Sequence, residues 1–136
     1  MRTVHLGSQA EYLRLSIPAD FDPEGWASVQ VEVVVQCFRG LIQAYLERPD
    51  LERFAQAVVA LHASLSGKAE LSPIEGQFSV ALVGNGRGAV SVSGLALANA
   101  SYGSKLQYEF ELDQTFLPPV ITELQTLLAG GERANA

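Results

Sequence analysis

The sequence predicts an α+β fold: one domain with a mostly antiparallel sheet and two amphipathic helices, at about residues 50–66 and 115–129, packed on one face. Several segments alternate polar and apolar residues, as strands with one buried face do, while the two helical segments repeat apolar residues every three or four positions. The connections are short, which suits antiparallel neighbours. At 136 residues the chain can bury a single core. We therefore expect one domain over residues 1–136, with a frayed tail from about residue 130 to 136.

The first half of the chain predicts three strands. Residues 12–17 alternate, and residues 27–38 carry the longest strand signal because their apolar side chains share one face: Val29, Val31, Val33, Val35 and Cys37. The position of Cys37 on this face predicts a buried, unreactive thiol. Gly40 permits a bend or a bulge, after which residues 41–47 return as an antiparallel neighbour.

The first helix is predicted over residues 50–66 from the spacing of its apolar residues: Leu51, Phe54, Val58, Leu61 and Leu65. Pro49 and Asp50 suit its first turn, because proline needs no amide partner there and aspartate can cap free amides. Gly67 lies just past its end.

The second half predicts three more strands, at residues 77–83, 89–97 and 105–112, followed by the second helix. Asn85-Gly86 predicts a hairpin turn rather than a phosphate-binding loop, because a strand follows it and not a helix. Gly94 lies where the buried phase shifts, which favours a bulge. The helix over residues 115–129 has Thr115 as a candidate N-cap, and the sequence shows no internal repeat.

Composition excludes several classes of function. The formal net charge of −6 and the isoelectric point near 4.8 oppose direct binding to nucleic acid. One cysteine allows no internal disulfide, and neither a metal-ligand cluster nor a catalytic or cofactor motif is recognisable. No apolar run is long enough for a membrane span or a secretion signal. We expect a cytoplasmic protein that is not an enzyme and holds neither metal nor cofactor.

The segment from residue 105 to residue 113 collects carboxylates on one face. Tyr108 and Phe110 alternate with Glu109, Glu111 and Asp113, so the acidic residues face outward if the aromatic residues are buried. Like charges in a row repel one another, and such a row is suited to a basic partner. We expect Glu109, Glu111 and Asp113 to be electrostatic contact residues, with Glu32, also on an outward phase, as a weaker candidate.

Two other readings of the acidic face compete with partner binding. The carboxylates can simply keep the open face of the sheet solvated. Alternatively, Glu109 with Glu111 or Asp113 could form an acid and base pair. Alternate residues of a strand, such as Glu109 and Glu111, lie roughly 6.5–7 Å apart. Nothing near them in sequence supplies the apolar burial that would raise one pKa, so the solvated face is favoured over the hydrolase.

Four stretches carry a resemblance to a known family. They are "CFRG" at residues 37–40, "PDLERFAQAVVAL" at 49–61, "GRGAVSVSG" at 86–94 and "DQTFLPPVITELQTLL" at 113–128. In this order they resemble the WapI-like immunity proteins, over about residues 27–128. The resemblance implies a bacterial cytoplasmic protein that binds the C-terminal domain of a contact-delivered toxin, typically a nuclease that acts on tRNA.

The leading hypothesis is a non-catalytic inhibitor that covers the surface of a basic partner, such as a nuclease toxin domain. A second hypothesis is a self-associating or small-ligand-binding module, because Val34 and Phe38 interrupt the polar phase of the longest strand. The third is the hydrolase with the paired carboxylates.

Overall fold

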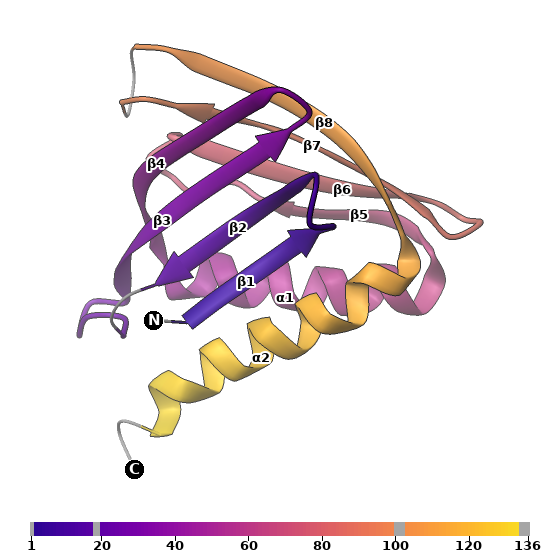
Figure 1. The fold of residues 1–136 in the computed structure, drawn as a ribbon. Coiled ribbons are helices and arrows are strands. Elements are labelled where there is room, and N and C mark those ends of the chain that lie inside the picture. Colours follow the sequence, from indigo (N-terminus) through magenta and orange to yellow (C-terminus); the bar gives the residue numbers. More distant parts are fainter. Residues whose placement is uncertain (1, 18–19, 100–102, 134–136) are drawn as a thin grey trace.

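A computed structural model describes residues 2–17, 20–99 and 103–133 and shows two four-stranded antiparallel sheets with two long helices (Figure 1). The first sheet contains β1 (Arg2–Gly7), β2 (Tyr12–Ile17), β3 (Trp26–Val35) and β4 (Phe38–Glu47) in that order, and α1 (Arg48–Ser64) follows. The second contains β5 (Ser66–Leu71), β6 (Phe78–Asn85), β7 (Ala89–Leu97) and β8 (Lys105–Asp113), followed by a short 3₁₀ turn, η1 (Gln114–Phe116), and α2 (Leu117–Arg133). The predicted α+β class is confirmed.

The same order of four strands and one helix therefore occurs twice along the chain. Each strand pairs only with its neighbours in sequence, and α1 separates β4 from β5, so the strands form two sheets rather than the one that we expected. This repeat is structural, since the two halves share no sequence pattern that predicts it.

The inner faces of both sheets and the apolar stripes of both helices form one hydrophobic core. In Figure 1, α2 lies beside β1, and α1 runs below the two sheets and packs against β5 and α2. Each fully buried large apolar side chain stabilises the fold by roughly 1.5–3 kcal/mol. The largest of these side chains are Phe54, Phe78, Ile17, Leu46, Leu51, Leu61, Leu71, Leu82, Leu117, Leu124, Leu127 and Val29.

Two strands were not predicted. In β1 the buried alternate residues are only Val4 and Leu6, too short a pattern to stand out. Its edge is closed by α2, where Glu123 Oε1 accepts a hydrogen bond of 2.9 Å from the backbone N–H of His5. In β5 only Ala69 and Leu71 are buried, so this strand depends on its pairing with β6.

The turn between β3 and β4 corrects two predictions. Val35 pairs with Phe38, and the intervening turn begins at Gln36, whose φ is 55°. Cys37 therefore lies exposed in the turn instead of in the core. Gly40 makes no bulge, since it pairs in register with Val33. A Cβ at Gly40 would lie 3.2 Å from Cδ2 of Leu106, so this glycine makes room for the second sheet.

The predicted bulge at Gly94 is also wrong. Gly94 pairs in register with Val80 on one side and with Tyr108 on the other. A Cβ there would overlap the carbonyl oxygen of Ser79 and lie 2.6 Å from the hydroxyl oxygen of Tyr108. Glycine is needed at this position because Ser79 and Tyr108 lie so close to its backbone, and not because the strand bulges there.

The hairpin turn at Asn85-Gly86 is confirmed. β6 ends at Asn85 and β7 begins at Ala89 as its antiparallel neighbour. Asn85 Oδ1 accepts hydrogen bonds from the backbone N–H groups of Arg87 at 2.7 Å and Ala89 at 3.2 Å, which hold the turn closed.

The helix ends differ from the predicted caps. α1 ends at Ser64, and Leu65 adopts a left-handed φ of 62° and donates its backbone N–H to Leu61. Asp50 forms an ion pair with Arg53 at 2.5 Å and does not cap the helix. At the second helical segment the cap is Asp113, which accepts a hydrogen bond of 2.9 Å from the backbone N–H of Thr115, because the segment begins with η1.

Residues 130–133, which we expected to fray, continue α2, while residues 134–136 lie outside the described part of the chain. Among the residues described, no helix is both long and apolar enough to cross a membrane.

Candidate functional site

The predicted carboxylates of β8 lie on the outer face of the second sheet. Glu109 pairs with Ser93, Glu111 with Ser91, and Asp113 with Ala89 on the adjacent strand β7. All three acidic side chains are exposed, while the alternate residues of β8 are buried. The structure therefore brings them together in one line, the β8 acidic row (Glu109, Glu111 and Asp113), along an edge of the sheet.

Glu109 and Glu111 make no ion pair or side-chain hydrogen bond with any residue in the described part of the chain. Their repulsion is weakened by water but not removed by a neighbouring cation. The side chains beside them on β7 are small, because Ser91 and Ser93 pair with them directly. The two carboxylates therefore project beyond the shorter serine side chains of β7.

A depression of about 500 Å³ borders the β8 acidic row. Gly94 and Glu109 are among its lining residues. Tyr108 supports it by donating its hydroxyl hydrogen to the carbonyl oxygen of Ser79 at 2.7 Å, and burial raises the pKa of this phenol. The lining residues are Ser79, Ser93, Gly94, Leu95, Gln107, Tyr108 and Glu109.

Asp113 has a structural role besides its place in the row. Hydrogen bonding to the backbone N–H of Thr115 holds the pKa of the Asp113 carboxyl below its ordinary value of 3.8. The same contact caps the helical segment that leads into α2. A substitution at Asp113 would therefore alter both the charge of the row and the helix start, whereas Glu109 and Glu111 can be changed without this complication.

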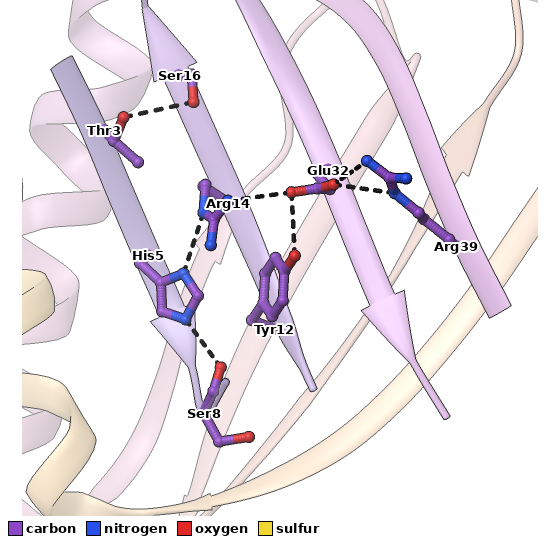
Figure 2. Close-up of polar contacts among 8 residues, drawn as sticks. All are labelled: Thr3, His5, Ser8, Tyr12, Arg14, Ser16, Glu32 and Arg39. Carbon is purple, nitrogen blue, oxygen red and sulfur yellow. Dashed lines mark hydrogen bonds and ion pairs between the residues drawn. The ribbon is translucent and has the colours of Figure 1, made fainter. Parts of the chain in front are cut away.

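Glu32 does not join the β8 acidic row, because it lies on β3 in the first sheet. Its side chain is 14% exposed and accepts hydrogen bonds from Arg39 at 2.6 and 3.0 Å, from Arg14 at 3.3 Å and from Tyr12 at 3.1 Å (Figure 2). The positive charges of Arg14 and Arg39 thus offset the negative charge of the Glu32 carboxylate. The structure makes Glu32 the centre of a separate polar network on the outer face of the first sheet.

This network extends across β2 to β1. Arg14 Nε donates a hydrogen bond of 3.2 Å to His5 Nδ1, and His5 Nε2 lies 2.8 Å from the carbonyl oxygen of Ser8 (Figure 2). With Nδ1 as acceptor, the proton of the neutral ring is on Nε2. The sequence alone does not reveal this network, because the network depends on the register in which β2 pairs with β1 and β3.

Glu32 should contribute stability that depends on pH. Burial disfavours its charged form, but hydrogen bonds from Arg39 and Tyr12 and the charges of Arg39 and Arg14 outweigh burial and hold its pKa below the ordinary 4.5. Because the folded-state pKa is the lower one, this contribution is present above pH 4.5 and is lost as the pH falls through the folded-state pKa.

We expect Glu32→Gln to be less stable than the wild type by about 1 kcal/mol at neutral pH, and the difference to shrink as the pH falls below 4.5 and through the folded-state pKa of Glu32. Urea unfolding at a series of pH values measures both. Glu109→Gln, which removes a carboxylate without an ion pair, is the matched control and should show little change. A Glu32→Gln difference that stays constant across the pH series would contradict the role assigned to the network.

The arrangement does not form the cleft that a paired-carboxylate hydrolase uses. Glu109 and Glu111 point the same way from one strand, both exposed, and do not face each other across a substrate site.

A second depression, of about 330 Å³, lies between α1 and α2, with Val59, Ile121 and Leu128 among its lining residues. Among the residues that the structure describes, no three His, Cys, Asp or Glu side chains could hold a metal ion.

Known proteins similar to this chain include one family and two solved structures. The sequence profile described as "Immunity protein WapI-like family" matches residues 4–130. The MRP1/MRP2 structure of Trypanosoma bruciei has a TM-score of 0.55 at 10% identity, covering 98% of this chain and 86% of that chain, which shows a shared fold. A CdiA-CT/CdiI toxin and immunity complex from Enterobacter cloacae has a TM-score of 0.46 at 9% identity, covering 93% of this chain and 99% of that chain. No curated protein sequence matches the chain.

Proposed function

This chain belongs to the WapI-like family of immunity proteins, and on that premise we propose that it neutralises a toxin domain in the cytoplasm by binding and covering it. The proposed partner is the C-terminal domain of a toxin that cleaves RNA, with a basic surface that holds the phosphate backbone. The proposed contact surface is the β8 acidic row with the depression beside it. No catalytic step by this chain is needed.

The observation that carries the proposal is the row of exposed carboxylates without cations in an immunity-family chain. Glu109 and Glu111 have no ion-pair partner among the described residues. A basic partner can therefore form ion pairs with them without first breaking an internal ion pair. A row of negative charges attracts a positively charged protein toward it and raises the association rate. An overall charge of −6 acts in the same direction.

Neutralisation would follow from competition for one surface. An RNA-cleaving domain binds its substrate through Lys and Arg contacts to phosphates. The carboxylates of the β8 acidic row carry the same negative charge as the RNA phosphates, so they can pair with the same Lys and Arg side chains. The bound immunity protein would then exclude RNA by occupying its site, with the small side chains of β7 allowing close approach.

Titration of a purified toxin domain with this protein tests the proposal. A candidate toxin domain that cleaves tRNA on its own is used in the assay, and the protein is added in increasing amounts. We expect cleavage to stop at an equimolar ratio and the two proteins to elute as one complex. Full cleavage in the presence of excess folded protein would sink the proposal for that toxin.

A further inference from the structure

The four edges of the two sheets are protected differently. The β1 edge is closed by Glu123 of α2, α1 packs along β5, and β8 carries the acidic row. β4 is the last strand of the first sheet and exposes apolar side chains instead, since Leu41 is 53% exposed and Tyr45 is 51% exposed. Long, apolar edges of this kind pair readily with another strand.

The backbone of β4 is available on its outer edge. Val35 and Phe38 close a two-residue turn and so form a hydrogen-bonded pair, after which such pairs alternate along the hairpin. The N–H and C=O groups of the alternate residues point away from β3, at Arg39, Leu41, Gln43 and Tyr45. In the described part of the chain, no backbone hydrogen bond outside the β3–β4 ladder reaches these residues.

We propose that a second copy of this chain pairs with that edge, β4 against β4, antiparallel about a two-fold axis at Gln43. In this register Arg39 lies opposite Glu47 of the partner subunit and Leu41 lies opposite Tyr45 of the partner subunit. Each contact occurs twice because of the two-fold symmetry. The first sheets of the two subunits, four strands each, become one continuous sheet of eight strands.

Chemical complementarity selects this register and this occupant. Opposite charges face each other, an aliphatic side chain faces an aromatic one, and Gln43 faces its own copy on the axis; cross-strand pairs of these kinds are favourable. A shift by two residues would place Leu41 opposite Gln43 and leave Glu47 opposite the uncharged Cys37. The pattern of β4 is therefore complementary to itself. The dimer does not depend on the proposed toxin.

A charge exchange tests the dimer and its register together. The Arg39→Glu chain and the Glu47→Arg chain each bring like charges together when they pair with themselves. A mixed pair of the two restores two opposite-charge contacts. We expect the wild type to sediment as a dimer, each variant to dimerise at least tenfold more weakly, and the mixture to form heterodimers at least tenfold more tightly than either variant pairs with itself.

Circular dichroism shows whether each variant is folded before its mass is measured. Val83→Lys is the matched surface control, because Val83 is 45% exposed on the second sheet, and it should dimerise like the wild type. Leu41→Lys should weaken the dimer. A wild type that stays monomeric at every concentration, or two folded variants that form no heterodimer on mixing, would overturn the proposal.

Discussion

Replacing Gly94 by alanine is expected to destabilise the folded protein by about 3 kcal/mol. The added Cβ would overlap the carbonyl oxygen of Ser79 and lie 2.6 Å from the hydroxyl oxygen of Tyr108. The first of these atoms is backbone and cannot move without displacing β6. The second belongs to a buried side chain that already donates a hydrogen bond to Ser79 at 2.7 Å. Urea denaturation of the variant measures the loss.

Gly40→Ala is the matched control for this prediction. It makes the same chemical change in a strand of the other sheet, where the new Cβ would lie 3.2 Å from Cδ2 of Leu106 and meet only the end of a flexible side chain. We expect a change of less than about 1 kcal/mol there. If Gly94→Ala were as mild as Gly40→Ala, the close packing of β6, β7 and β8 described above would be wrong.

Reversing two charges of the β8 acidic row is expected to slow association with the toxin domain about 100-fold at low salt. The variant is Glu109→Lys combined with Glu111→Lys, which leaves the capping Asp113 in place. The association rate should fall because the new cations repel a basic surface, and added salt should reduce the difference. Stopped-flow binding at two salt concentrations measures both effects.

A second double variant separates the row from the net charge. Glu24→Lys combined with Glu75→Lys changes the overall charge by the same amount, at exposed positions outside β8. We expect this control to retain most of the wild-type association rate. Equal slowing by the two double variants would mean that the whole-molecule charge, and not the β8 acidic row, attracts the toxin.

The elements with long periodic patterns were predictable from sequence. α1 and the strands β2, β3, β7 and β8 were found within a few residues of their bounds, because each buries a regular stripe of side chains. β1 and β5 were missed because each buries few residues and is stabilised by pairing with a neighbour. The division into two sheets depends on contacts between segments distant in sequence, which local patterns do not contain.

The same reasoning separates the two parts of the candidate site. The direction of Glu109, Glu111 and Asp113 follows from the alternation of a single strand, since its other face must be buried. The surroundings of Glu32 depend on how β2, β3 and β4 align, which brings Arg14 and Arg39 to the same carboxylate. The alternation along β3 therefore predicts that Glu32 lies on an outer face, but it contains no sign that two arginines offset its charge.

Growth of cells that express the toxin domain, with and without this protein, is the direct test of neutralisation by binding. We expect the wild-type protein to restore growth and to co-purify with the toxin domain in an equimolar complex. The Glu109→Lys, Glu111→Lys variant should protect less well at the same expression level. Cells that stop growing despite abundant, folded wild-type protein would contradict neutralisation of that toxin by binding.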